Sequence, residues 1–171
     1  MQEIKFNNER GELDKLCQYI DQRSLMVEIG SLAGVSTEIF SKYFQNVVSV
    51  DPYIGGYDQN DINSQQSRLD KAKSIFTEKF KHNPGVTQLN ITSEQASHKY
   101  QDDRSIDLVY IDAAHTYEAV LHDINMWKTK AKYIAGHDWD WKGVRSAVSE
   151  SFHDKNVVIF KPNHWIVNNE L

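Results

Sequence analysis

Several residue types that carry function in other proteins are scarce in this chain. Cys17 is the only cysteine, so neither an internal disulfide nor a cysteine-rich metal site can form. It falls at helical spacing with Leu16 and Ile20, which indicates a buried structural thiol rather than a nucleophile. Lysine and arginine form no basic block, and the net charge is −5. A nucleic-acid duplex or long strand is therefore disfavoured as a partner, while a local contact stays open.

Long apolar runs are also missing. The longest are short and broken by charged residues, so we expect no membrane-spanning segment and no membrane partner. The opening residues, MQEIKFNNER, lack the apolar stretch of a secretory signal, and we expect a cytoplasmic protein. The 171 residues are 40% hydrophobic and 25% charged, without repeats or linkers, which fits one globular domain over residues 1–171.

What the chain does contain is a regular alternation of β-branched apolar runs and amphipathic stretches. This alternation is typical of an α/β protein, in which helices cover a parallel sheet. The predicted strands are 25–29, 46–50, 86–89, 106–111 and 133–135. The predicted helices are about 9–22, 37–44, 63–81, 93–100, 117–127 and 143–152. Two last runs, 157–160 and 165–167, are too close together for a helical crossover, so they predict an antiparallel hairpin.

A glycine turn follows the first predicted strand. The segment from Val27 to Ser36 reads VEIGSLAGVS, in which Gly30 and Gly34 are separated by three residues. This spacing differs from the Gly-x-Gly-x-x-Gly that binds a dinucleotide pyrophosphate. Asp51 ends the second predicted strand, where a carboxylate can accept hydrogen bonds from both ribose hydroxyls of an adenosine. Alone, each feature also fits a tight turn with a helix N-cap.

Four motifs in order carry a family resemblance: Glu28-x-Gly30-x-x-x-Gly34-x-Ser36; Val-Asp51; Asp112-x-x-His115-x-Tyr117; and Gly136-His-Asp138 with Gly143-Val144. Over residues 24 to 152 the chain resembles the class I S-adenosylmethionine-dependent methyltransferases, and most closely the methyltransferase-24 family. The resemblance implies a three-layer αβα Rossmann-like sandwich. Its seven-stranded, mostly parallel sheet would have the order 3-2-1-4-5-7-6, with strand 7 antiparallel.

The resemblance also assigns the cofactor site. Glu28 would lie near the methionine amino group, and Asp51 would hold the ribose hydroxyls. Tyr53 would lie against the adenine, and Thr92 and Ser93 would face its edge. The remaining residues implied to contact S-adenosylmethionine are Gly30, Ser31, Gly34, Ser36 and Asp112.

The positions of the strand ends predict which residues lie near the methyl group that is transferred. Ligands of an open parallel sheet bind outside the carboxyl ends of the strands, which places Asp112, His115 and Asp138 beside the methyl group. An alcohol acceptor needs a base or a metal at neutral pH, and His115 suits the role of base. Related O-methyltransferases of sugars and phenols imply Mg²⁺ at Asp112 and Asp138. His137 stands where relatives have an acid, so it is the third candidate ligand. Imidazole is a poor Mg²⁺ ligand, so a metal-free site stays open.

The identity of the methyl acceptor, and with it the type of reaction, leaves the most alternatives open. We expect O-methylation of a small hydroxylated molecule, such as a sugar or a sugar-bearing metabolite. N-methylation, a non-catalytic nucleotide-binding module and an NAD-type oxidoreductase remain alternatives. The acceptor pocket would be open, built from loops 53–62 and 137–143, or completed by a partner chain in a homodimer. Loop 53–62 could be a lid or an ordinary exposed loop.

Two further groups of residues have an open assignment. Trp139 and Trp141 could form an aromatic wall for a ring-shaped substrate or pack over the sheet edge. The remaining histidines have no motif context, and we expect them at the surface or in packing: His82, His98, His122, His153 and His164.

Overall fold

The computed structural model describes residues 2–57, 62–153, 157–161 and 163–169, with the backbone alone over 2–9. Its helices are α1 (Gln2–Tyr19), α2 (Val35–Tyr43), α3 (Gln66–Phe80), α4 (Ser93–Ser97), α5 (Tyr117–Trp127) and α6 (Lys142–Ser151), with a 3₁₀ turn η1 (Ile62–Ser64). Its strands are β1 (Leu25–Ile29), β2 (Asn46–Val50), β3 (Val86–Leu89), β4 (Ile106–Ile111), β5 (Ala131–Gly136), β6 (Val157–Phe160) and β7 (His164–Asn168).

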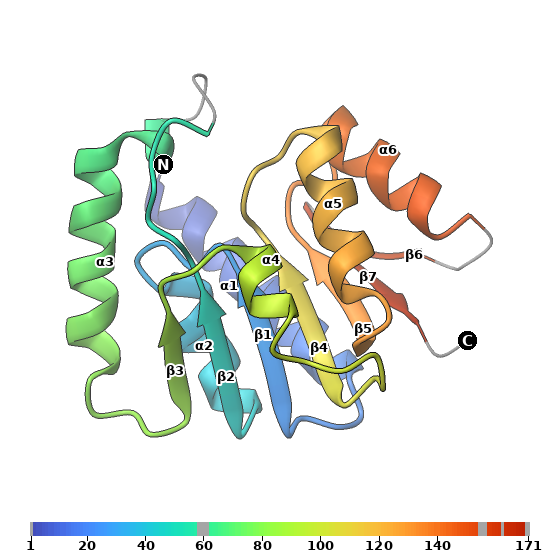
Figure 1. Cartoon of the computed structure of the whole chain (residues 1–171), viewed down its shortest axis with the longest axis horizontal. Helices are drawn as coiled ribbons and strands as arrows, with labels where there is room; N and C mark the ends of the chain where they lie inside the picture. Colours follow the sequence, from blue (N-terminus) through green and yellow to red (C-terminus); the bar gives the residue numbers. More distant parts are fainter. Residues whose placement is uncertain (1, 58–61, 154–156, 162, 170–171) are drawn as a thin grey trace.

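All seven strands form one sheet in the order β3-β2-β1-β4-β5-β7-β6 (Figure 1). The first five strands pair in parallel, and β7 runs antiparallel to both β5 and β6. The predicted Rossmann-like sheet and its hairpin are therefore confirmed. Because β1 and β4 are neighbours while β2 lies on the far side of β1, the strand order reverses between β1 and β4. A crevice forms at such a reversal, beyond the carboxyl ends of the strands.

Helices cover both faces of the sheet, as Figure 1 shows. On one face, α4, α5 and α6 bury their apolar sides against the odd-numbered positions of β1 and β4, among them Val27 and Val109. On the other face, α1 and α2 pack on Met26, Leu108 and Tyr110. Such two-sided burial explains why β4 is buried at every position.

Cys17 of α1 lies inside this second core, as its spacing predicts, and burial raises the pKa of its thiol to about 12. A thiol in that state is a poor nucleophile.

The first helix differs most from its prediction. It was expected over 9–22 but spans Gln2–Tyr19. Its early residues are polar, so apolar periodicity gave no signal there. Its end is set by contacts from elsewhere: Arg23 donates to the carbonyl of Ile20, and the carboxylate of Asp107 accepts from the backbone N–H groups of Ser24 and Leu25. The helix therefore ends three residues before its predicted end, while β1 begins at Leu25 as predicted.

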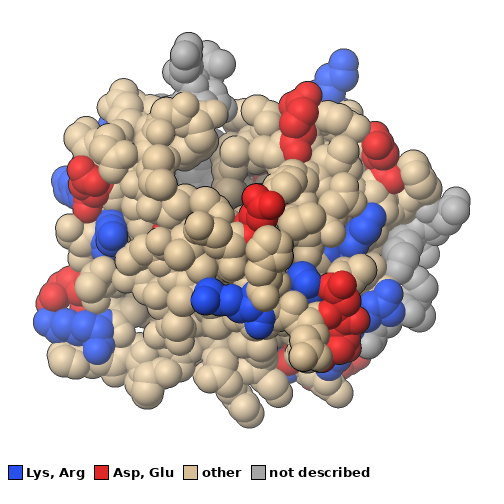
Figure 2. All heavy atoms as spheres, viewed as in Figure 1, with Lys and Arg blue, Asp and Glu red and all other residues tan. Residues whose placement is uncertain are grey.

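The surface carries charges of both signs. Lysine, arginine and acidic side chains are interspersed over the face seen in Figure 2, without a patch of one sign. Within the described residues, every helix is too short or too polar to cross a membrane.

Candidate functional site

The turn after β1 brings two strand ends into unusually close contact. Gly30 has a φ of 85°, in the left-handed region, and its N–H donates to the carbonyl of Val50. A Cβ atom at Gly30 would lie 2.3 Å from the carbonyl oxygen of Asp112 and 2.8 Å from Cα of Ala113. Only glycine fits this position, because both the backbone conformation and the approach of the next segment exclude a side chain.

Glu28 lies beneath this turn and is completely buried. Its carboxylate accepts hydrogen bonds from the hydroxyls of Ser36 and Thr37, both at 2.5 Å, and of Ser49 at 2.9 Å. Burial raises the pKa of this carboxyl to about 7, against the effect of the three hydroxyls. Glu28 therefore ties β1 to α2 and β2 and lies outside the lining of the cavity described below.

Asp51 organises the second side of the turn. One carboxylate oxygen accepts from the N–H of Leu32 at 3.0 Å, and the other accepts from the N–H of Tyr53 at 2.8 Å. Burial raises the pKa of Asp51, while these backbone donors act in the opposite direction. The Tyr53 hydroxyl donates to the carbonyl of Leu32 at 2.8 Å, so this ring packs under the turn. Asp51 lines the cavity, whereas the ring of Tyr53 supports it from below.

A cavity of about 700 Å³ lies over the carboxyl ends of β1, β4 and β5. Volumes of this size are typical of small-molecule and cofactor sites. Thr92 and Ser93 form part of its wall: Thr92 caps α4 by accepting from the N–H of Gln95, and the Ser93 hydroxyl accepts from Trp127 Nε1 at 2.9 Å. The predicted cofactor residues that line the cavity are Gly30, Ser31, Ser36, Asp51, Thr92, Ser93 and Asp112. Those that lie outside its lining are Glu28, Gly34 and Tyr53.

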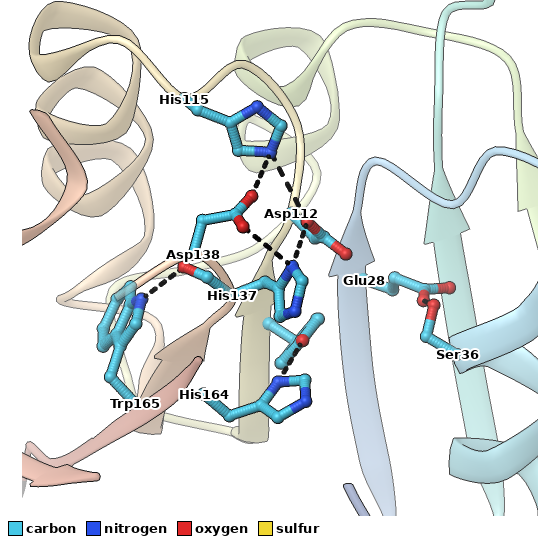
Figure 3. Close-up of polar contacts among 9 residues, drawn as sticks. Glu28, Ser36, Asp112, His115, His137, Asp138, His164 and Trp165 are labelled. Atoms are coloured by element: carbon cyan, nitrogen blue, oxygen red, sulfur yellow. Dashed lines mark hydrogen bonds and ion pairs between the residues drawn. The ribbon is translucent and has the colours of Figure 1, made fainter. Parts of the chain in front are cut away.

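Two carboxylates and two imidazoles meet on the wall of this cavity (Figure 3). Asp112 follows β4, His137 and Asp138 follow β5, and His115 extends from the loop before α5. His115 Nε2 lies 2.9 Å from Asp138 Oδ2 and 3.6 Å from Asp112 Oδ1. His137 Nδ1 lies 3.6 Å from Asp112 Oδ1 and 3.4 Å from Asp138 Oδ1. We call these four residues the Asp–His cluster.

The charges of the Asp–His cluster stabilise one another. Burial alone would lower the pKa values of His115 and His137, but the nearby carboxylates of Asp112 and Asp138 raise each to about 10. Burial alone would raise the pKa of Asp112, yet the imidazoles lower it to about 2, and they hold that of Asp138 well below its usual range. At neutral pH the cluster is therefore two imidazolium cations between two carboxylates.

This donor set does not fit Mg²⁺. Among the described residues, the group whose ligand atoms lie close enough to share an ion is Asp112, His115 and Asp138, with all atoms within 4.8 Å of one another. His137, the third ligand considered from the sequence, lies outside this group. Mg²⁺ prefers oxygen ligands in octahedral geometry, whereas here the third donor is a nitrogen and both carboxylates are paired with imidazoles.

The two tryptophans of the loop after β5 separate in the structure. Trp139 packs against the core on the α5 side of the sheet. Trp141 is 48% exposed, and its ring centroid lies 5.1 Å from that of His115. Trp141 therefore offers an exposed ring beside the Asp–His cluster. The loop expected at 53–62 contributes Ile54 and Tyr57 to the cavity, and its residues 58–61 lie outside the described part.

His164 lies at the site although no motif predicted it there. It was expected at the surface or in packing, and its 2% exposure agrees with packing, but it also lines the cavity. The signal that could have located it is the direction of β7. Since β7 runs antiparallel to β5 and pairs Trp165 with Gly136, its first residue lies where the parallel strands end. Strand direction, rather than any motif, places His164 at the site.

The sequence matches the methyltransferase-24 family, described as a methyltransferase domain, over residues 27–139. A search of curated proteins finds no match. Among solved structures, an rRNA methylase from Streptococcus thermophilus has a TM-score of 0.64 at 11% identity, covering 94% of this chain and 93% of its own. The N-methyltransferase NodS from Bradyrhizobium japonicum has a TM-score of 0.61 at 13% identity, with 98% and 97% covered.

Aeropyrum pernix fibrillarin, solved with natively bound S-adenosyl-L-methionine, has a TM-score of 0.55 at 10% identity, with 85% of this chain and 66% of that chain covered. At these identities the structural likenesses establish the fold, and the family match covers most of the chain. The chain belongs to the methyltransferase-24 family of class I S-adenosylmethionine-dependent methyltransferases.

Proposed function

We propose that this protein, acting as one catalytic domain, transfers a methyl group from S-adenosylmethionine to a hydroxyl of a small acceptor, such as a sugar or a sugar-bearing metabolite. The observation that carries the proposal is the shared cavity: the glycine turn and Asp51 line it together with Asp112, His115 and Asp138. A cofactor held on the first set and an acceptor held by the second would meet inside one space of about 700 Å³.

The cofactor part of the cavity would be formed by the turn and Asp51. The carboxylate of Asp51 uses two of its acceptor positions on backbone N–H groups and retains lone pairs for the ribose hydroxyls. Because those N–H groups fix its orientation, the carboxylate loses little freedom when it binds a ligand. S-adenosylmethionine supplies an activated methyl group on a positively charged sulfur.

The acceptor part would use the Asp–His cluster. A hydroxyl becomes a competent nucleophile when a base removes its proton, and we propose His115 for this step. In the cofactor-free protein His115 is protonated, since its pKa is raised to about 10. A positive sulfur brought into the same cavity disfavours a second cation, so cofactor binding would promote loss of this proton. Asp138 would then orient the neutral ring. The exposed ring of Trp141 could cover one face of a sugar.

Cofactor binding is the first test. Titration calorimetry should detect S-adenosylhomocysteine and should detect no binding of NAD. In Asp51→Ala the affinity should fall by about 1–3 kcal/mol, because ribose hydroxyls lose their acceptors. Arg104→Ala, at an exposed position away from the cavity, is the control and should bind as the unmodified protein does. Binding of NAD without S-adenosylhomocysteine would refute the proposed function, and an unchanged affinity in Asp51→Ala would remove the ribose role of Asp51.

Metal dependence is the second test. A chelator should leave turnover unchanged, and millimolar Mg²⁺ should not raise it, because both carboxylates are already neutralised by imidazolium cations. Turnover would be followed with labelled cofactor across a panel of sugars, phenols and amines. The panel also separates O-methylation from N-methylation by the products formed. Loss of activity on chelation, with recovery on addition of Mg²⁺, would contradict a metal-free cluster.

A further inference from the structure

One wall of the cavity is formed by residues that neither the cofactor site nor the Asp–His cluster uses. They come from α1, α2, β4 and β7, and we call them the α1-side wall: Arg10, Leu13, Ile39, Tyr110 and His164. Leu13, Ile39 and Tyr110 are also buried members of the core on this face of the sheet. The α1-side wall is thus largely apolar, with polar groups from Tyr110, His164 and the exposed Arg10.

His164 has one paired and one unpaired ring nitrogen. Its Nδ1 lies 2.8 Å from the hydroxyl oxygen of Tyr110, and its Nε2 is buried without a hydrogen-bond partner. The ring centroid lies 4.7 Å from that of His137, and Figure 3 shows the two rings one above the other. Burial, together with the positive charge of His137, lowers the pKa of His164 to about 4. His164 is therefore a neutral imidazole beside a charged one.

The hydrogen-bond inventory determines which nitrogen of His164 carries the proton. Burial raises the pKa of Tyr110 well above its ordinary value, so the phenol keeps its hydrogen. Its bond to His164 is the hydrogen bond that the structure gives this hydroxyl. If Nδ1 were the donor, the Tyr110 hydrogen and the lone pair of Nε2 would both lack a partner. If Tyr110 donates, only Nε2–H is unpaired, and buried polar groups are rarely left without partners.

We infer that His164 binds the methyl acceptor, through a hydrogen bond from Nε2–H to an oxygen that the acceptor carries in addition to its methylated hydroxyl. This inference rests on the proposed function and adds the chemistry of the acceptor. Leu13 and Ile39, which line the same wall, favour an apolar or ring-shaped body. The acceptor class is therefore a molecule with an apolar or ring-shaped body, a hydroxyl directed to the Asp–His cluster, and a carbonyl or ether oxygen directed to the α1-side wall.

If no ligand contacts Nε2–H of His164, this donor stays unpaired both in the free protein and during catalysis. Leaving a buried donor unsatisfied costs about 1–3 kcal/mol, and an apolar side chain of similar size would avoid that cost. Nε2 is itself buried in this structure, so an acceptor oxygen reaches it when the side chains around it move aside, and the donor becomes favourable only in that complex. The same reasoning predicts discrimination, because a molecule that lacks this oxygen leaves Nε2–H unpaired in its complex.

A pair of probes that differ in one oxygen tests the inference. Para-hydroxyacetophenone has a ring, a hydroxyl and a carbonyl oxygen, and para-ethylphenol has nearly the same shape without the carbonyl. With the protein saturated by S-adenosylhomocysteine, we expect the ketone to bind about tenfold more tightly than the ethyl compound. In NMR spectra of isotope-labelled histidine, the Nε2 signal of His164 should move on addition of the ketone and stay in place with para-ethylphenol.

Two substitutions at the same position provide the matched variants. The amide of Asn occupies the place of Nδ1, so His164→Asn keeps a partner for Tyr110 but has no atom at the place of Nε2. The amide of Gln reaches further, so His164→Gln retains a donor toward the cavity. The preference for the ketone should fall below about twofold in His164→Asn and remain in part in His164→Gln. His98→Asn, at an exposed position outside the cavity lining, should keep the full preference.

Each outcome either supports or overturns the inference. Equal affinity for the two probes, no binding of the ketone, or an unchanged preference in His164→Asn would overturn it. If the Nε2 signal of His164 moves with neither probe, the unpaired donor is a purely structural feature and the inference is overturned. Failure of the proposed function is detected separately, because S-adenosylhomocysteine would then fail to bind before any probe is added. Its affinity for the His164 variants also reports whether they fold.

Discussion

Gly30→Ala should abolish cofactor binding and lower the free energy of unfolding by about 2–5 kcal/mol. The new methyl group would lie 2.3 Å from the Asp112 carbonyl oxygen, a distance that real contacts do not reach. Relief requires the end of β1 and the segment after β4 to separate, and Asp112 belongs to that segment. Both halves of the site would move together. Calorimetry with S-adenosylhomocysteine and denaturant unfolding would measure the two effects.

Gly56→Ala is the matched control for the unfolding measurement only, because Gly56 itself lines the cavity. Gly56 also has a positive φ, of 84°, but a Cβ atom there would meet nothing within 4 Å. It therefore carries the conformational cost of alanine in the left-handed region, about 1–2 kcal/mol, without the collision. If the two variants lost equal stability, the close approach of Gly30 to Asp112 would have no energetic consequence and the interpretation of the turn would be incorrect.

His115→Asn should reduce turnover by about 10²- to 10⁴-fold while the affinity for S-adenosylhomocysteine stays within about threefold. The imidazole would take the proton of the acceptor, whereas the cofactor would be held by the turn and Asp51 on the other side of the cavity. His82→Asn, at an exposed position with no role in the site, should retain full turnover. Parallel loss of cofactor affinity and turnover in His115→Asn would mean that His115 supports the structure instead.

The pH dependence of the unmodified protein tests the same role with a defined sign. A base acts in its unprotonated form, and the pKa of His115 is raised to about 10 in the cofactor-free protein. The value of kcat/KM should therefore rise with pH above neutrality, with an inflection between the ordinary histidine value of about 6.5 and about 10. A profile that is flat over the whole range from about pH 5.5 to about pH 10 would exclude His115 as the base.

The sheet could be predicted because its central strands are buried on both faces and read as apolar runs. Helix α5 was predicted within its observed bounds, since its apolar stripe and its N-cap at Thr116 agree. The strand order could not come from periodicity and was expected from the family resemblance alone. The start of α1 was missed because polar residues at its beginning give no apolar stripe. Apolar periodicity in the sequence thus located the helices and strands that bury one side, and missed segments that do not.

The site residues that could be predicted are those that directly follow a strand. Asp51, Asp112 and Asp138 each end a parallel strand, so their meeting at one edge follows from the fold. Partners of side chains could not be predicted in this way. Glu28 was expected under the glycine turn, where it lies, but the three hydroxyls from α2 and β2 that donate to its oxygens could not be foreseen. The ion pairing of His115 with Asp138 joins two loops, and neither loop alone indicates the charge that the imidazole carries.

The position of β7 between β5 and β6 imposes an order of events during synthesis. In the sheet β7 lies between β5 and β6, so β6 has no strand beside it until residues 164–168 have been made. The first residue of β7 also completes the cavity wall. A nascent chain that already carries the glycine turn, Asp51 and the whole Asp–His cluster therefore has an open sheet edge and an unfinished acceptor pocket. Domains generally fold as units, so recognition of the acceptor would begin only after β7 has left the ribosome.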